Sequence, residues 1–473
     1  MGEDKQKLSR RLRLAGRLTV ALTLIVTGIA VLADAWHQWE LKLEVDGVKE
    51  AIGDSERYLQ GGTPAERWHE KKVSHSNGWL EVSFLWEAGR YAQVWDRSGN
   101  KDRLQQSPDG RLWLGLEQVR NYHTATARQL EADAAEDGSS PGTEYSDEDL
   151  RELLKNTEEL PAACSRANKY DTVSPIRVKG TLTDNWSQRL SEGDTWTIKS
   201  AMFGRLAALE SLGEIESVES ELLVYARFWS KYCHPLNSSD ASYRISALLE
   251  AFEKASAGCS EGTFSEQALD EMLALPIDAD SYLEETLVAD VVWMSMTIQR
   301  EEYALRDPDC FEWLSRRKSA PPDSESYSNP LARFGQRREY CRYVRVSLLF
   351  GIQCVNVFRH PRPWSELKPS EVTSEFFASY TPRELPELSM GFRRLDVARV
   401  DLELHMLERK SGPLAEQREQ VEQLLADHAT VGHRWDGDAL EVFPVPFMEF
   451  PPDAERDEVD SRKSMTVRLE STH

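Results

Sequence analysis

Residues 196–231 read WTIKSAMFGRLAALESLGEIESVESELLVYARFWSK, and this stretch determines the fold class of the chain. Apolar side chains recur in it every three or four residues, at Ile198, Met202, Leu206, Leu209, Leu212, Ile215, Val218, Leu222, Ala226 and Trp229. Such spacing places them on one face of an α-helix, whereas a half-buried strand would need strict alternation. Gly213 interrupts the pattern, so the stretch predicts one amphipathic helix or two helices joined at this glycine.

Runs of the same kind continue along the chain, at 242–257, 265–274, 280–303, 339–358 and 392–410. Ser146 with Asp149 has the pattern of a helix N-cap, and Thr263 with Glu266 resembles a capping box ahead of the run at 265–274. We therefore expect a mainly α-helical chain, α+β overall. The successive paired helices would allow a solenoid-like body, although no repeat is regular enough to predict a tetratricopeptide array.

A different pattern precedes these helices. Residues 79–116 contain WLEVSFLW, RYAQVW and RLWLGL, separated by segments rich in glycine, asparagine and proline. Alternating β-branched and aromatic residues between turn residues predict a small antiparallel β meander. Its tryptophans are the candidate ligand-binding residues, Trp79, Trp86, Trp95 and Trp113. Exposed rings could stack on a glycan, but burial beneath a helix at 119–134 is the interpretation we favour.

An uncharged apolar run of 16 residues, LTVALTLIVTGIAVLA at 18–33, follows a basic N-terminus. With Asp34, Ala35 and Trp36 it is just long enough to cross a bilayer, and Trp36 and Trp39 suit the interface. We therefore expect residues 18–36 to form a single-pass anchor in membrane lipid, with a cytoplasmic N-terminus and an extracytoplasmic, periplasmic body. A cleaved signal peptide ending near Ala33 is the alternative.

Changes in composition predict the domain boundaries. The segment EADAAEDGSSPGTEYSDED at 131–149 and the segment SRRKSAPPDSESYSNP at 315–330 have the composition of linkers. Near the end, Asp436-Gly437 predicts a turn before the strand-like LEVF. The expected order is a basic segment at 1–17, the anchor at 18–36, a stalk helix with the meander at 37–130, a linker at 131–149, a helical domain at 150–314, a linker at 315–330, a helical domain with a short extended segment at 331–450, and a disordered tail at 451–473.

Charge and cysteine content limit the partners. The net charge of −23 would repel a phosphate backbone, so nucleic acid is excluded as a partner, and a mean hydropathy of −0.54 excludes a polytopic membrane protein. Six cysteines without a Cys-x-x-Cys pair predict up to three disulfides in an exported protein, with fifteen pairings open, or else buried thiols. They are Cys164, Cys233, Cys259, Cys310, Cys341 and Cys354.

The search for catalytic chemistry yields one weak motif. Residues 258–262 read GCSEG, which matches the G-x-S-x-G pattern of a serine nucleophile, but the preceding LLEAFEKASA is helical rather than a strand. A hydrolase would have to pair Ser260 with a distant histidine, of which the candidates are His234, His360 and His405. No metal or cofactor motif is present, and carboxylate pairs such as Glu284-Glu285 predict solvated helix ends.

Three stretches carry a resemblance to a known group: residues 203–232, 243–275 and 392–429. With the basic start, the apolar run and Gly412-Pro413, they resemble a loose group of uncharacterised, single-pass, mostly helical bacterial envelope proteins. The group has no assigned activity, so the resemblance implies location and shape alone.

These features together predict a membrane-anchored, extracytoplasmic helical protein that acts by binding, as a scaffold of the cell envelope, rather than as an enzyme. Its expected partners are other envelope proteins or cell-wall glycan. An envelope hydrolase with a site formed from distant residues, and a glycan-binding module built on the tryptophan-rich meander, are the alternatives.

Overall fold

The computed structural model describes residues 78–97, 105–134, 145–173, 192–232, 238–287, 353–361, 385–450 and 465–469, together with a few residues between 19 and 36. The chain divides into two compact units. All helices and strands named below belong to the unit formed by residues 59–293, 350–374 and 379–473.

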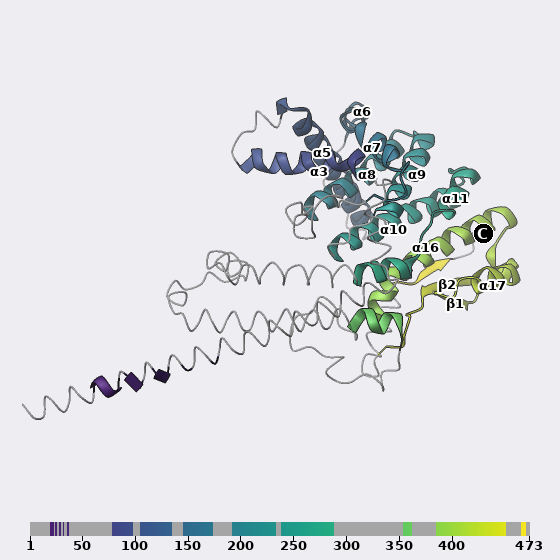
Figure 1. The fold of residues 1–473 in the computed structure, drawn as a ribbon. Helices are drawn as coiled ribbons and strands as arrows, with labels where there is room; N and C mark the ends of the chain where they lie inside the picture. The colour runs from purple at the N-terminus through teal and green to yellow at the C-terminus, as the bar shows by residue number, and fades with distance from the viewer. Residues whose placement is uncertain are drawn as a thin grey trace, which may run out of the picture. The chain divides into compact units, whose positions relative to one another are not determined.

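The predicted helical class is confirmed. The described helices are α3 (Trp79–Arg97), α5 (Pro108–Ala134), α6 (Asp147–Asn156), α7 (Glu159–Ala167), α8 (Glu192–Ser211), α9 (Ile215–Lys231), α10 (Ser238–Ser260), α11 (Glu266–Leu273), α16 (Leu385–Ser411) and α17 (Arg418–Ala426), with a short 3₁₀ turn η5 (Leu414–Gln417) before α17 (Figure 1). Residues 279–287 and 353–359 are also helical.

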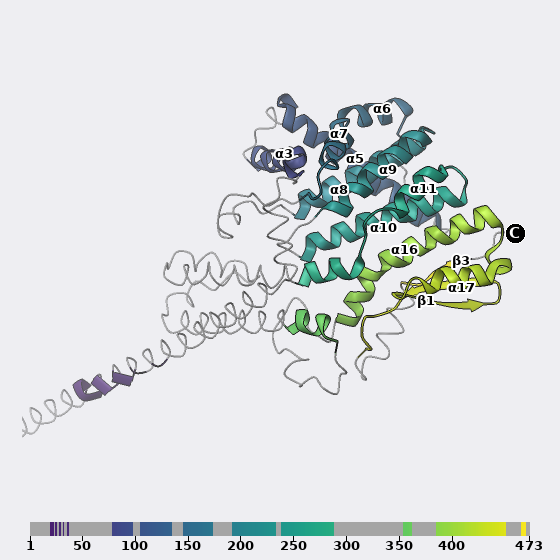
Figure 2. The ribbon, with the colours of Figure 1, turned by 45° about the vertical axis from the view of Figure 1, so that its right-hand side comes forward.

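The long helices α8, α10 and α16 pack side by side in chain order and run in the same direction (Figure 2). Lys199 of α8 donates to Ser246 of α10. Nearer the C-terminal end of both helices, Glu210 of α8 pairs with Lys254 of α10, so the two helices run in parallel. The shorter helices α9 and α11 are also parallel to each other, because Glu219 pairs with Ser265 and Arg227 with Glu271. The short helix α9 thus returns the chain from the end of α8 to the start of α10.

The turn between α8 and α9 lies at Gly213, as the sequence predicts. Gly213 has a φ of 72°, and Glu214 donates its backbone N–H to the carbonyl of Leu209, which closes the end of α8. The turn between α10 and α11 has the same design, with Gly262 at a φ of 71°. The N-cap of α11 is Ser265, which accepts from the N–H of Ala268, so the predicted capping box of Thr263 and Glu266 is wrong.

The predicted β meander at 79–116 is also wrong, because the segment forms α3 and the start of α5. Buried side chains in α3 fall at a helical spacing, at Trp79, Val82, Leu85 and Trp86. The supposed turn at 108–110 is the beginning of α5: Ser107 accepts from the N–H of Gly110, and Pro108 occupies the first helical position. Ser107 and Pro108 therefore begin a helix rather than form a turn between strands.

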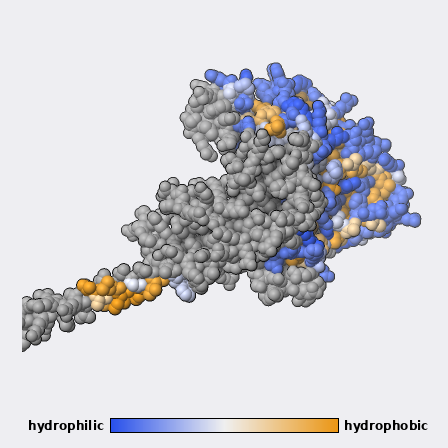
Figure 3. Space-filling model, viewed as in Figure 1, coloured by the Kyte–Doolittle hydropathy of each residue, from blue (hydrophilic) through white to orange (hydrophobic). Residues whose placement is uncertain are grey.

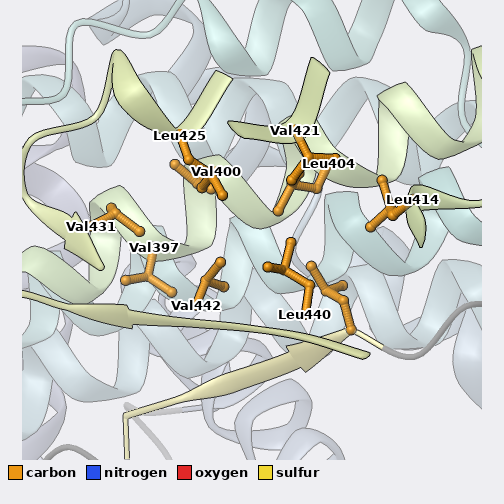
Figure 4. Packing of buried hydrophobic residues seen from close by; sticks show 10 residues of the cluster. Val397, Val400, Leu404, Leu414, Val421, Leu425, Val431, Leu440 and Val442 are labelled. Carbon is orange, nitrogen blue, oxygen red and sulfur yellow. The ribbon is translucent and has the colours of Figure 1, made fainter. Parts of the chain in front are cut away.

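The sheet of this unit lies instead near the C-terminus. Strands β1 (Val431–Asp436), β2 (Ala439–Pro444) and β3 (Val467–Leu469) form an antiparallel sheet in the order β1-β2-β3. The predicted turn after Asp436 and the strand at LEVF are confirmed. Val397, Val400 and Leu404 of α16 pack against Leu440 and Val442 of the sheet, with α17 closing the same core (Figure 4). The tail expected to be disordered thus supplies β3.

The predicted membrane anchor is corrected. Of residues 18–36, the structure describes 19–22, 24–25, 28–29, 32 and 36, which are helical, and Figure 3 shows them as an apolar stretch. Across the part of the chain that is described, no helix combines the length and apolar composition that a bilayer crossing requires. The structure therefore does not support the single-pass localisation built on that run.

The predicted disulfides are corrected as well. Cys164, Cys259 and Cys354 are all buried, and none of the three forms a disulfide. Cys233, Cys310 and Cys341 lie outside the described residues, as do the basic segment 1–17, the stalk helix and the linker at 315–330. The flanks of the linker at 131–149 belong to α5 and α6, which lie in the same compact unit.

Candidate functional site

The tryptophans proposed as ligand-binding residues lie in the helical core. Trp79, Trp86 and Trp113 are 8%, 4% and 4% exposed. Trp86 donates its indole N–H to Thr195 at 3.1 Å and stacks on Tyr232 with ring centroids 6.2 Å apart. These three rings present no face to solvent on which a sugar could stack, and the side chain of Trp95 lies outside the described residues.

Ser260 does not occupy a nucleophile turn. It is the last residue of α10, and its hydroxyl donates to the carbonyl of Ala257 at 2.9 Å. His405 lies on α16 beside Asp401, and His360 follows the helix at 353–359; neither of these described histidines hydrogen-bonds to Ser260. His234 lies outside the described residues. Because the preceding element is a helix, the serine is not raised above a sheet as this chemistry requires.

Two of the described thiols, Cys164 and Cys259, are poor nucleophiles because they are buried. Cys164 is fully buried beside Glu221, and burial raises the pKa of its thiol far above the ordinary range. Burial also raises the pKa of Cys259, although the nearby Arg409 opposes the shift. Both groups therefore stay protonated near neutral pH, and the thiolate is the reactive form.

In the described part of the chain, polar side chains from α5 and α10 converge over the outer side of α8. We call it the α8 face and define it by Arg120 and His123 of α5, Trp196 and Lys199 of α8, and Ser246 and Glu250 of α10. Each pair is separated by three or four residues, so both members lie on the same side of their helix. The α8 face therefore joins three helices, through an α5–α8 contact between residues 77 positions apart and an α8–α10 contact between residues 47 positions apart.

Lys199 is the centre of this arrangement. Its ammonium group lies 2.7 Å from a carboxylate oxygen of Glu250 and 2.9 Å from the hydroxyl of Ser246. His123 reaches the other Glu250 oxygen at 3.3 Å, so side chains of α5 and α10 meet above α8. Beneath them the Phe203 ring is almost fully buried, with the Lys199 nitrogen 5.5 Å from its centroid.

The electrostatics of the α8 face favour a neutral imidazole. Burial lowers the pKa of His123, and the positive charges of Lys199 and Lys254 lower it further, against the opposing effect of Glu250. A neutral His123 can both donate and accept a hydrogen bond. The face therefore offers a cation, a carboxylate and an adaptable imidazole within one patch.

An exposed aromatic ring extends the patch. Trp196 is 41% exposed, and the guanidinium carbon of Arg120 lies 5.2 Å from its ring centroid. Arg120 is held in place by hydrogen bonds to Thr197 at 3.3 Å and to Asn121 at 3.0 Å. A tryptophan and an arginine held rigidly at a surface are the residue types that most often dominate protein–protein binding energy.

The acidic pairs expected to be solvated helix ends are partnered instead. In the helix at 279–287, Asp280 accepts two hydrogen bonds from Arg393 at 2.7 and 2.6 Å. Glu284 pairs with Arg359 at 2.5 Å, and Glu285 pairs with Arg244 at 3.2 Å. Arginines from three separate elements thus fix this helix, which is a structural role rather than a catalytic one.

The α8 face was not predicted from the sequence. Trp196 and Lys199 fall between the regularly spaced apolar residues of α8, so the sequence indicates that they lie on the outer side of that helix. The sequence around them does not indicate which other helices lie beside them. Among the described residues, no group of three histidine, cysteine, aspartate or glutamate side chains is placed to hold a metal ion.

Comparisons with known proteins add no assignment: no family model matches the chain, and neither the curated proteins nor the solved structures include a significant match. The resemblance to envelope proteins therefore stays a prediction.

Proposed function

We propose that this chain acts by binding, as a scaffold whose solenoid-like body takes up a segment of another protein on the α8 face. The observation that carries the proposal is the convergence of Arg120, His123, Lys199 and Glu250 from the three helices α5, α8 and α10 around the exposed Trp196. Arrays of stacked helices characteristically bind partners across several repeats in this way.

The chemistry of the face favours a protein partner. Trp196 supplies apolar contact area, while the groups around it supply both charges and a neutral imidazole, which suits a segment with an apolar residue among polar ones. A chain with a net charge of −23 would be repelled by nucleic acid. The preorganised Arg120 side chain also reduces the conformational entropy lost on binding.

Site-directed photo-crosslinking tests the proposal. Benzoylphenylalanine replaces Trp196 in one version of the full chain and Asp270, an exposed residue of α11, in the control version. After irradiation in an extract of the producing cells, we expect discrete adducts from position 196 that are absent from position 270. Unlabelled native chain should suppress them at least tenfold, because it competes for the same partner.

A variant competitor distinguishes specific binding from general stickiness. Unlabelled chain carrying both R120A and W196A should compete far less well than the native chain. Equal adducts at positions 196 and 270, or equal competition by the native and doubly substituted chains, would show that the α8 face is not a binding site.

A further inference from the structure

A second polar cluster lies between α10 and α16, and none of its residues belongs to the α8 face. We call it the α10–α16 seam and define it by Ser256 and Cys259 of α10 with Asp401, His405 and Glu408 of α16. Asp401, His405 and Glu408 are spaced by four and three residues, so they share one side of α16. His405 lies 3.7 Å from Asp401 and 4.0 Å from Glu408, which makes a row of three interacting groups.

The seam contains polar atoms whose hydrogen bonds are incomplete. Ser256 is 5% exposed and Asp401 is 9% exposed. Within the described part of the chain, Ser256 Oγ, Asp401 Oδ1 and Glu408 Oε1 are buried and have no hydrogen-bond partner. A buried acceptor without a donor destabilises the fold, and a charged one does so more strongly. The ionised form of Asp401 is therefore the unfavourable form in this packing.

The titration of Asp401 agrees with this geometry. Burial raises the pKa of its carboxyl, while the nearby Ser256 hydroxyl and the charge of His405 act in the opposite direction. On α10, Asp401 also faces Glu253 and Cys259, whose own pKa values are raised chiefly by burial. Arg394 opposes the shift at Glu253, and Arg409 and Lys410 oppose it at Cys259.

We propose that the α10–α16 seam is a proton-binding joint, in which uptake of one solvent proton by Asp401 tightens the packing of α16 against α10. The protonated carboxyl gains an O–H that can donate to the neighbouring Ser256 Oγ, and the buried charge disappears. Because α16 also packs against the sheet, the joint controls how firmly α16, α17 and β1–β3 are attached to the preceding helices.

The direction of the pH effect follows from linkage. A carboxyl whose pKa is higher in the folded chain than in the unfolded chain binds its proton more tightly when folded. The cost of ionised Asp401 is fully present above the folded pKa, and it is relieved as the pH falls through that value toward the ordinary aspartate range. Acidification from neutral pH should therefore strengthen the seam.

Hydrogen exchange of the full chain, followed by mass spectrometry and corrected for intrinsic exchange rates, tests the joint. Between pH 7 and pH 5 we expect protection of α16 to rise severalfold in the native chain, because folded Asp401 binds its proton more tightly than unfolded Asp401 does. D401N should be protected at pH 7 and show little further rise. D270N, at an exposed carboxylate, should follow the native chain.

A second variant keeps the proposal testable if D401N does not fold. H405Q removes an imidazole whose protonated form favours ionised Asp401, so it should move the rise in protection to higher pH, whereas a merely structural histidine would leave its position unchanged. A native profile in D401N, loss of α16 protection in a D401N chain whose α5 and α8 stay protected, or an unchanged position of the rise in H405Q would overturn the joint. The proposal is independent of partner binding at the α8 face.

Discussion

Arg205 of α8 is a buried charge whose hydrogen-bond donors are matched by acceptors from two other helices. Its side chain donates to both carboxylate oxygens of Glu221 in α9, at 3.0 and 2.6 Å. It also donates to Thr157 at 2.7 Å and to the carbonyl of Leu154 at 2.6 Å, at the end of α6. Tyr225 adds a hydrogen bond to Glu221 at 2.8 Å. One guanidinium of α8 therefore fastens both α6 and α9.

We expect R205M to destabilise the folded unit by about 3 kcal/mol, because the substitution leaves Glu221 charged and buried without its partner. R151A is the matched control, since Arg151 is 64% exposed and its ion pair with Asp147 spans 4.0 Å. That variant should lose less than about 1 kcal/mol. Urea unfolding followed by circular dichroism measures both, and equal losses would contradict the account.

At single residues, an interaction was predictable from the sequence where both partners lie close together along the chain. Ser146 and Asp149 form the expected reciprocal cap of α6, because both partners lie within one turn. The Arg205–Glu221 pair joins residues 16 positions apart, and in a chain with 80 acidic residues no spacing singles out Glu221. Partners across helices depend on packing, which residue type alone does not specify.

At the scale of an element, a glycine can mark a turn or allow two helices to pack closely. The sequence of 79–116 does not show which of the two applies, and there the helical alternative is the correct one. Gly89 belongs to one of the glycine-containing segments that the pattern of 79–116 predicts as turns, but it lies within α3, where a Cβ atom would meet the Trp113 ring at 2.6 Å. The same use of glycine brings α5 and α8 together, since a Cβ at Gly204 would lie 2.4 Å from the carbonyl oxygen of Val119. The end of α8 at Gly213 and the start of α6 at Ser146 were predictable from sequence, but these close approaches required the packed structure.

We expect G204A to destabilise the unit by about 2 kcal/mol, because the added methyl group forces α5 and α8 apart against a backbone atom that cannot rotate away. The control is G391A, also within a helix, where a Cβ meets nothing within 4 Å. Alanine there should stabilise α16 by about 0.5 kcal/mol through its helix propensity. Thermal unfolding that shifts both variants in the same direction would contradict this assignment.

At the scale of the whole unit, helix content and the final hairpin were predictable, while the order of packing was not. The periodicity of 196–231 and of 392–410 reports which side of each helix is buried, and Asp436-Gly437 reports a turn. Neither pattern predicts that α16 packs against α10, which lies more than 120 residues earlier in the chain. Neither predicts the contact between Arg393 and Asp280, which are 113 positions apart. Long-range pairs of this kind hold the C-terminal sheet to the helical body.

Arg393 is the residue through which this attachment can be tested. It joins α16 to the helix at 279–287 through Asp280, and to the segment after β2 by a 2.7 Å hydrogen bond to the carbonyl of Val445. Its side chain is 10% exposed while that of Asp280 is 38% exposed, so part of the pair is screened by water.

We expect R393M to cost about 2 kcal/mol and to loosen the sheet before the helices. Hydrogen exchange should therefore rise severalfold in β1 and β2 with little change in α5 and α8. R434M is the matched control, because Arg434 is 70% exposed and Glu441 keeps its second partner, Arg468. Uniform loss of protection across all helices in R393M would mean that the sheet and the helices unfold as one, and that Arg393 is not a local fastening.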